Sequence, residues 1–436
     1  MGGTGDRQKL SRDQKTAVLC PVSLSRNKLS SDSYTYKREE AISLAHAINL
    51  EVEYSETFIL RQTKPSTLFG AGTVESLANI FQEKGIGLAI VNGSLTPVQQ
   101  RNLENAWKVK VVDRTGLILE IFGARARTSE GRLQVELAAL NYAKSRLVRC
   151  WTHLERQRGG LGFIGGPGET QIEIDRRLIS NRIAKLSKEL AQVKKTRELH
   201  RESRRKVPFP IVALVGYTNA GKSTLFNRLT QSKVFAKDLL FATLDPTMRA
   251  FKLPSGQEII LSDTVGFISD LPTQLVAAFR ATLEEVLEAD LVLHVRDISH
   301  PETESQNQDV LDVLKELGLE AVVEEGLFEA CNKIDQVADR SFLRPETDRS
   351  RLISAITGEG VEGLIEMIEH QLNKNHRLFK IQLPHDNGRP LAWLHAHGQV
   401  LGVDFDEEKT LLTVKLSPVI RNRFRLQFPA LSLSPL

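Results

Sequence analysis

One stretch decides the fold of the central part of the chain: Ile211-Val212-Ala213-Leu214-Val215-Gly216-Tyr217-Thr218-Asn219-Ala220-Gly221-Lys222-Ser223. It opens on an apolar run of the kind that forms a strand buried on both faces of a parallel sheet. The glycine spacing that follows is typical of a phosphate loop, and a helical pattern over 224–229 comes next. In this context backbone N–H groups and the helix N-terminus face phosphate oxygens. The stretch therefore predicts a nucleotide site in an α/β domain.

The phosphate loop assigns two side chains directly. Lys222 reaches the β and γ phosphate oxygens, and Ser223 offers its hydroxyl to Mg²⁺. The rest of the loop is expected to line the phosphates: Gly216, Tyr217, Thr218, Asn219, Ala220 and Gly221.

A second motif, Asp263-Thr264-Val265-Gly266, follows the apolar run at 259–261. A strand ending here places Asp263 where its carboxylate can hold the Mg²⁺ shell through water. Gly266 leaves its N–H free for the γ-phosphate. We therefore assign Lys222 and Gly266 to the catalytic machinery.

The third motif, Asn332-Lys333-Ile334-Asp335, predicts the base that is bound. Guanine presents N1–H and N2–H₂ side by side, which one carboxylate accepts together, whereas adenine presents no such pair. Asp335 therefore favours GTP over ATP. Asn332 braces the loop and meets N7, and the stem of Lys333 covers the base plane.

The fourth motif is Ser354-Ala355, at the end of a predicted strand, where a backbone N–H reaches the guanine O6. The order of the four motifs, each closing a strand, is that of a GTPase domain. GTP is thus the expected substrate and Mg²⁺ the expected cofactor.

Between the first two motifs lies a candidate switch segment that supplies a threonine to Mg²⁺ and the γ-phosphate. Thr243 and Thr247 are both candidates on the residues alone. At position 267, where small signalling GTPases carry a water-orienting glutamine, this chain has Phe267. A phenyl ring cannot orient water by hydrogen bonding, so slow intrinsic hydrolysis is expected. The segment reads Phe241-Ala242-Thr243-Leu244-Asp245-Pro246-Thr247.

Length and composition limit the number of domains and the class of protein. A chain of 436 residues, 41% hydrophobic and 26% charged, predicts several globular domains. No apolar run approaches the roughly 18 residues of a membrane span. Cys20, Cys150 and Cys331 are odd in number and widely spaced, which indicates neither disulfides nor zinc. We expect a cytoplasmic monomer without an integral membrane span; the net charge of +4 decides nothing about partners.

Strands alternate with helices in the first part of the chain, which predicts a parallel α/β domain. The turn at 69–73 lacks the third glycine and the preceding strand of a dinucleotide fingerprint, so a second nucleotide site there is not favoured. The expected strands are 16–21, 56–61 and 87–92, and the expected helices are 39–50 and 74–84.

Residues 131–206 predict a helical arm. A helix over 131–151 precedes a glycine-rich segment, 159–168, which fits either a flexible linker or a loop pressed against RNA. Between 171 and 206, twelve basic residues face five acidic ones, which suits either a solvated face or a polyanion contact. This second helix carries a coiled-coil seam that pairs it with the first: Ile179, Ile183, Leu186, Leu190 and Val193.

Together these motifs resemble the HflX family of ribosome-associated GTPases over nearly the whole chain. The resemblance extends from 101–104, 113–118 and 130–137 to the glycine-rich 159–179 and the GTPase motifs. It implies that Thr243, rather than Thr247, binds Mg²⁺, which makes Thr243 catalytic as well. It also implies that a hydrophobic residue at 267 is usual. The strand before Asn332 is less apolar than the family's run, and the tail before Thr16 lies outside its pattern.

As partners, the resemblance implies GTP, GDP and the large ribosomal subunit with its RNA. It further implies stimulation of hydrolysis by ribosomes and the splitting of stalled ribosomes under stress such as heat. A tRNA-modifying GTPase shares the motif order but ends in a cysteine-bearing motif, and no cysteine follows Cys331. A signalling GTPase with protein partners only is the other alternative; charge reversal at Arg197, Arg201 and Arg204 would separate the two readings of the arm.

The fold class expected from these observations is α/β. It comprises a polar tail (1–16), a parallel α/β domain (17–130), a coiled-coil arm (131–206), a P-loop GTPase domain (207–375) and a small mixed α/β C-terminal domain (376–436). Strands at 411–416 and 423–428 are expected in the last.

Overall fold

The structure is a computed structural model of the chain. No helix in the part of the chain it describes is long and apolar enough to cross a membrane. The described residues are 14–23, 31–126, 128–155, 171–204, 209–231, 240–241, 243, 246–269, 286–340, 343, 347–374, 377–384, 388–405, 409–416, 421, 424–425, 427–429 and 431–435.

The first domain is a parallel four-stranded sheet with the order β2-β1-β3-β4, which confirms the predicted parallel α/β fold. Side chains of α1 and α4 pack on one face of this sheet, and those of α2 and α3 pack on the other. The strands are β1 (Lys15–Ser23), β2 (Glu51–Leu60), β3 (Leu88–Val91) and β4 (Lys110–Asp113). The helices are α1 (Ser31–His46), α2 (Ala71–Lys84), α3 (Pro97–Trp107) and α4 (Arg114–Arg125).

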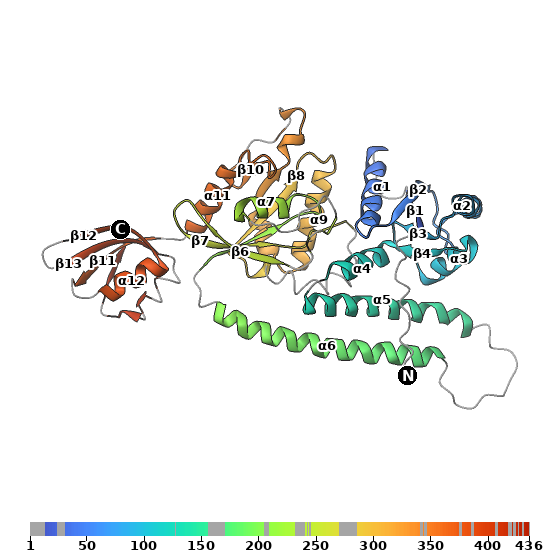
Figure 1. The fold of residues 1–436 in the computed structure, drawn as a ribbon, viewed down its shortest axis with the longest axis horizontal. Helices are drawn as coiled ribbons and strands as arrows, with labels where there is room; N and C mark the ends of the chain where they lie inside the picture. The colour runs from blue at the N-terminus through green and yellow to red at the C-terminus, as the bar shows by residue number, and fades with distance from the viewer. Residues whose placement is uncertain are drawn as a thin grey trace.

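Two long helices, α5 (Ser129–Glu155) and α6 (Gln171–Arg204), lie side by side as a hairpin below the domains (Figure 1). The predicted pairing is confirmed, because α5 packs against α6 and Leu186 of the seam is only 1% exposed. The glycine-rich segment 159–168 lies outside the described residues.

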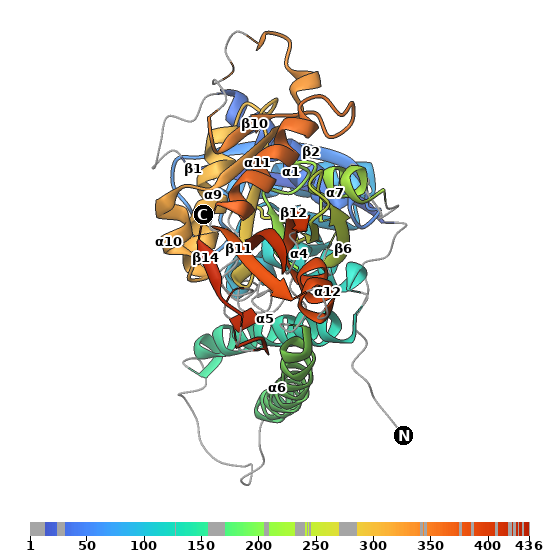
Figure 2. The same ribbon diagram turned by 90° about the vertical axis from the view of Figure 1, so that its left-hand side faces the viewer.

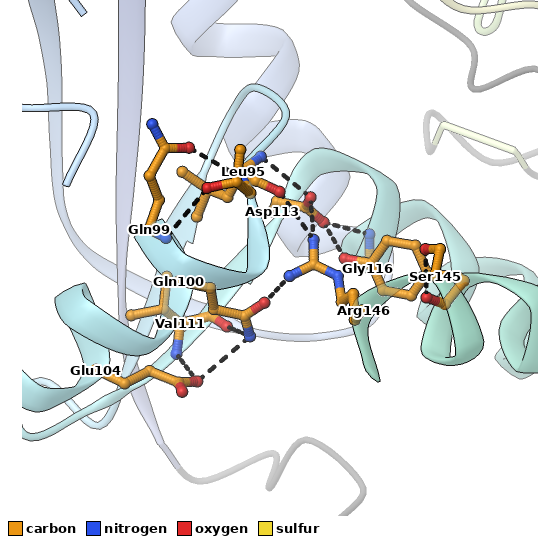
Figure 3. Close-up of polar contacts among 11 residues, drawn as sticks. Leu95, Gln99, Gln100, Glu104, Val111, Asp113, Gly116, Ser145 and Arg146 are labelled. Atoms are coloured by element: carbon orange, nitrogen blue, oxygen red, sulfur yellow. Dashed lines mark hydrogen bonds and ion pairs between the residues drawn. The ribbon is translucent and has the colours of Figure 1, made fainter. Parts of the chain in front are cut away.

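A cluster of polar side chains joins the arm to the first domain at the carboxyl end of β4 (Figure 3). Asp113 caps α4 by accepting from the N–H of Gly116 at 2.9 Å. The same carboxylate accepts from Tyr142 and Arg146 of α5, and Arg146 also reaches Gln100 of α3. The cluster therefore fixes the direction in which α5 leaves the domain.

The central domain is built on a six-stranded sheet with the order β10-β9-β8-β5-β7-β6. Its strand pairs are parallel except that β6 runs antiparallel to β7 at the edge. The carboxyl ends of β5, β7, β8 and β9 therefore meet at one edge. The strands are β5 (Ile211–Val215), β6 (Thr247–Lys252), β7 (Glu258–Asp263), β8 (Leu291–Asp297), β9 (Phe328–Asn332) and β10 (Ser350–Leu352). The helices are α7 (Lys222–Thr230), α9 (Thr303–Glu316), α10 (Glu320–Glu325), the 3₁₀ turn η1 (Ile334–Gln336) and α11 (Val361–Asn373).

The last domain stands apart at one end of the molecule (Figure 1), the end that faces the viewer in Figure 2. Its strands pair antiparallel in the order β12-β13-β11-β14, with α12 beside them. The predicted strand at 411–416 is confirmed, but a strand at 423–428 is wrong. Phe424, Arg425 and Gln427 are helical and Phe428 N–H donates to Phe424 O, four residues back, with both aromatic rings packed in the core; residues 423 and 426 lie outside the described part of the chain. The elements are β11 (Arg377–Pro384), α12 (Gly388–His397), β12 (Gln399–Phe405), β13 (Lys409–Leu416) and β14 (Leu433–Pro435).

Candidate nucleotide site

The phosphate loop follows β5 and needs glycine at both ends. Gly216 has φ +151°, and a Cβ there would lie 2.2 Å from the carbonyl oxygen of Val295. Gly221 has φ +97°, and a Cβ would lie 2.1 Å from Nδ2 of Asn332. The loop is therefore pressed against β8 on one side and against the base motif on the other.

Lys222 opens α7 and is held inside the loop. Its Nζ donates to the carbonyl oxygens of Gly216 at 3.0 Å and Tyr217 at 2.7 Å. Burial lowers the pKa of Lys222 to about 8, an effect that the Asp263 carboxylate opposes. Anionic phosphates at this point would favour the protonated ammonium.

Three oxygen-bearing side chains converge at the end of β7. The carboxylate Oδ2 of Asp263 accepts from Ser223 at 2.7 Å and from Thr243 at 2.9 Å, and the two hydroxyl oxygens are 2.8 Å apart. Asp263 is fully buried, which raises its pKa, and its Oδ1 has no hydrogen-bond partner among the described residues. Hard oxygen donors around a buried carboxylate suit Mg²⁺.

The two candidate threonines differ in position. Thr243 contacts Ser223 and Asp263 through its side chain, whereas Thr247 opens β6 and pairs with Asp263 through the sheet register. The structure thus brings Thr243, not Thr247, to the three-residue cluster. Phe241 is buried nearby with φ +55°, while Ala242, Leu244 and Asp245 lie outside the described residues.

The segment after β7 is joined to the phosphate loop through its backbone. Thr218 N–H donates to Phe267 O at 2.7 Å, and Phe267 N–H donates to Gly216 O at 3.1 Å. A Cβ on Gly266 would lie 2.8 Å from Cα of Thr218 and 3.0 Å from Nζ of Lys222, so Gly266 sits beside the Lys222 ammonium. The side chain of Phe267 is buried in an apolar cluster.

The side chains of Thr264 and Val265 are held inside the GTPase domain. Both side chains are buried, and the Thr264 hydroxyl donates to Leu214 O at 2.6 Å. The structure therefore leaves only their backbone to face a nucleotide.

Asn332 at the end of β9 ties the base motif to its neighbours. Its Nδ2 donates to Ala220 O at 2.8 Å, and its Oδ1 accepts from Ala355 N–H at 2.8 Å. Asp335 is exposed in η1, behind the buried Ile334. Ser354 is fully buried and its hydroxyl accepts from Thr357 N–H at 3.1 Å, which shapes the loop that carries Ala355. The four motifs thus meet in one place.

Comparison with known proteins agrees with this geometry. Residues 35–123 match a family described as GTP-binding GTPase N-terminal, 125–204 one described as GTP-binding GTPase Middle Region, and 211–332 one described as 50S ribosome-binding GTPase. GTPase HflX of Magnetococcus marinus is 52% identical over 91% of this chain and 92% of that protein. The chain belongs to the HflX family. Its Escherichia coli relative of the same name is 43% identical over 80% of this chain and 82% of its own length.

Family membership makes the protein a P-loop GTPase that hydrolyses GTP. A crystal structure of a Sulfolobus solfataricus GTP-binding protein in complex with GDP is also similar, with 25% identity, coverage of 83% of this chain and 99% of that one, and a TM-score of 0.44.

Sequence reasoning missed two residues of the HflX site. Arg228 of α7 donates from Nε to Ala355 O at 2.6 Å and also reaches Ile356 O, so the phosphate-loop helix holds the fourth motif. Asp297 pairs with Lys333 at 2.6 Å. Asp297 lies at the end of a buried strand, as Asp263 does. The same reasoning that selected Asp263 could therefore have selected Asp297. No comparable signal marks Arg228.

Proposed function

We propose that this HflX-family GTPase binds the large ribosomal subunit through its arm and uses GTP to split stalled ribosomes under stress such as heat. It acts as a cytoplasmic monomer. The 50S ribosome-binding family matched by residues 211–332 and the basic excess of α6 support this proposal. Both ribosomal RNA and the subunit surface are partners in it.

At the nucleotide site, Ser223 and Thr243 hold Mg²⁺ and Asp263 orders its shell. When bound, the ion neutralises charge on the β and γ phosphates. Lys222 binds the same oxygens, and the N–H of Gly266 donates to the γ-phosphate; a Cβ on Gly266 would lie 3.0 Å from Lys222 Nζ, so the two residues are neighbours. The loop from Gly216 to Gly221 lines the phosphates with its N–H groups, together with backbone of 241–245 and 263–266.

Asp335 lies in η1, just after the carboxyl end of β9, and its side chain is exposed. Its carboxylate can therefore accept from the two adjacent guanine donors. Asn332 holds the motif against the phosphate loop, and the ion pair with Asp297 fixes the stem of Lys333. The backbone N–H of Ala355 donates to Asn332 Oδ1 at 2.8 Å, and we assign the guanine O6 as a second acceptor of this N–H when GTP is bound.

The contact of Ser223, Thr243 and Asp263 carries this assignment. GTP turnover should be measured with and without purified large ribosomal subunits, with Lys222→Ala as the blank for contaminating activity. Thr243→Ala should abolish stimulated turnover, whereas Thr247→Ala should retain it. Equal slow rates with and without subunits would direct the partner search to tRNA or proteins.

The RNA contact of the arm needs its own test. Arg176, Lys188 and Lys195 are exposed on α6, so reversing all three to glutamate should weaken subunit binding and lower its salt dependence. The matched control reverses Lys252, Lys315 and Lys374, which are exposed on the GTPase domain. Equal loss in both triple variants would contradict a contact specific to the arm.

Splitting is tested by sedimentation of stalled ribosomes after incubation with protein and GTP. Free subunits should accumulate with the unchanged protein and not with Lys222→Ala. Stimulated hydrolysis without free subunits would refute splitting while leaving ribosome binding intact.

A further inference from the structure

The phosphate loop contains one buried hydroxyl without a hydrogen-bond partner in the described part of the chain. It belongs to Thr218, which is 5% exposed and whose Oγ1 is the unpaired atom. The other two hydroxyls of the loop are paired. That of Tyr217 donates to Glu40 at 2.5 Å, and that of Ser223 donates to Asp263 at 2.7 Å. Burying a hydroxyl without a partner costs free energy, so the oxygen of Thr218 does not serve the packing of the domain.

Thr218 lies beside the position assigned to the γ-phosphate. A Cβ on Gly266 would lie 2.8 Å from both Cα and Cγ2 of Thr218, and 3.0 Å from Nζ of Lys222. In the function proposed above, Gly266 donates its N–H to the γ-phosphate and Lys222 binds the phosphate oxygens. The side chain of Thr218 therefore borders the space in which the γ-phosphate is hydrolysed.

The residue that should orient the attacking water stands in the same place and lacks the chemistry to do so. Phe267 occupies the position of the orienting glutamine, and its ring is buried in an apolar cluster. Its carbonyl oxygen accepts from Thr218 N–H at 2.7 Å. The Thr218 hydroxyl is thus carried by a residue bonded to the one whose side chain cannot orient water.

We propose that Thr218 is a catalytic residue of this GTPase, and that its hydroxyl orients the attacking water in place of the missing glutamine. A threonine hydroxyl offers one O–H donor and two acceptor lone pairs. Oγ1 accepts from the water and donates to a γ-phosphate oxygen, which holds the water against the phosphorus. The proposal rests on the assignment of the nucleotide site and deepens it.

The threonine hydroxyl is unchanged by the reaction. The water oxygen bonds to the γ-phosphorus while the bond between this phosphorus and the β–γ bridging oxygen breaks. The bridging oxygen keeps the electron pair and leaves on GDP. A water proton passes to a γ-phosphate oxygen, and inorganic phosphate carries it away. Because a hydroxyl has one donor hydrogen where a glutamine amide has two, slow intrinsic hydrolysis is expected.

The alternative is that Thr218 only packs between the phosphate loop and Gly266. Thr218→Val separates the two roles, because valine keeps the shape and replaces Oγ1 by a methyl group. A packing role predicts an unchanged rate of hydrolysis, with equal or higher stability because an unpaired buried hydroxyl is lost. The catalytic role predicts slower hydrolysis at the same or higher stability.

Intrinsic single-turnover hydrolysis at saturating Mg²⁺ and GTP, without ribosomal subunits, measures the chemical step in the full chain. Thr218→Val should lower this rate constant at least on the order of tenfold, with GTP affinity changed by less than about threefold. Thr218→Ser keeps the hydroxyl and should stay within about threefold of the unchanged protein. The matched control is Thr230→Val, which removes a hydroxyl that donates to Phe226 O in α7 and should keep the rate.

An unchanged rate constant in Thr218→Val overturns the proposal. An equal loss in Thr218→Ser also overturns it, because the effect would then belong to the methyl group. Loss of GTP binding in Thr218→Val would make the hydroxyl a binding group and would likewise refute a role in the chemical step. Thermal unfolding checks that each variant is folded, and Thr218→Ala, with the same expected loss of rate, replaces a valine variant that is not.

Failure of the underlying assignment gives a different result. If the unchanged protein and Lys222→Ala hydrolyse GTP equally, the nucleotide-site assignment itself fails. Absence of stimulation by ribosomal subunits bears only on the partner, because the rate constants compared for Thr218 are measured without subunits.

Discussion

Phe267 stands where other GTPases orient the attacking water, and its surroundings give it a different task. The ring is 2% exposed and packs with Tyr217, Val265 and Phe241 in the cluster shared with the N-terminal domain. Its backbone pairs with the phosphate loop on both its N–H and its carbonyl. The phenyl ring therefore packs in the core and does not face the position of an attacking water.

Restoring a glutamine at this position should therefore not restore fast hydrolysis. Phe267→Gln places an amide in an apolar cluster, which costs about 2–4 kcal/mol of stability. Intrinsic single-turnover hydrolysis should not rise above that of the unchanged protein, and the midpoint of thermal unfolding should fall. Phe267→Leu, which stays apolar, should lose less stability. Faster hydrolysis in Phe267→Gln with an unchanged midpoint would contradict this account.

His294 gives the GTPase domain a pH dependence. It lies on β8, 1% exposed, and its Nδ1 has no hydrogen-bond partner among the described residues. Burial, with the positive charges of Arg296 and Lys222, lowers the pKa of His294 to about 3. The folded state thus keeps the imidazole neutral while the unfolded chain takes up a proton below about pH 6.5.

Stability should therefore be lost as the pH falls from about 6.5 toward 3, because the unfolded state binds more protons. Between pH 7 and pH 5 this one group removes about 2 kcal/mol. Pulse proteolysis across urea should show that the stability difference between the unchanged protein and His294→Gln shifts by this amount over that interval. A difference that does not change with pH would show that His294 is not buried in the neutral form.

At the scale of elements, the base motif and the phosphate loop form one unit. Asn332 at the end of β9 reaches across to Ala220, and the absence of a side chain on Gly221 leaves room for its amide. Arg228 of α7 adds a second tie to the loop that follows β10. Guanine and phosphates therefore meet a preassembled pair of loops.

Gly221→Ala tests this coupling. Its Cβ would overlap Asn332 Nδ2, and its φ of +97° disfavours a side chain, so GTP affinity should fall at least tenfold. Gly256→Ala is the matched control: its φ is +87°, and the nearest atom is the flexible Lys252 Cε at 3.9 Å. It should lose stability but keep its affinity in titrations with fluorescent GDP. Equal affinity losses in both variants would point to backbone strain rather than to displacement of Asn332.

The elements also show what a sequence can predict. The run at 211–215 gave β5 because a continuous apolar stretch before a glycine-rich loop has few other solutions. Local pattern misled at 423–428, where the aromatic spacing fits a strand or a helix and only packing with Trp393 decides. α1 begins at Ser31, eight residues before the expected start. The prediction missed these first turns because they are polar and carry no apolar periodicity. Arg228 contacts Ala355 across a long sequence separation, so no local pattern marks it.

At the scale of the whole molecule, two adjacent residues at the start of α4 face different partners. Asp113 holds the arm through Tyr142 and Arg146 (Figure 3). Arg114 holds the GTPase domain through Ser269. The N-terminal domain therefore contacts both the arm and the GTPase domain. These contacts form one route by which the arm is connected to the nucleotide site.

Loosening the arm without touching the GTPase interface should separate stimulated from intrinsic activity. Arg146→Met removes the contacts of α5 with Asp113 and Gln100 but leaves Asp113 its cap on Gly116. Intrinsic single-turnover hydrolysis should stay within about twofold, whereas stimulation by large ribosomal subunits should fall on the order of tenfold, because a mobile arm cannot transmit its position. Glu136→Gln is the control, since it weakens an exposed pair with Arg182 that joins only the two arm helices and leaves the basic residues of α6 in place. Full stimulation in Arg146→Met would mean that the subunit acts on the GTPase domain directly, and the arm would then serve binding alone.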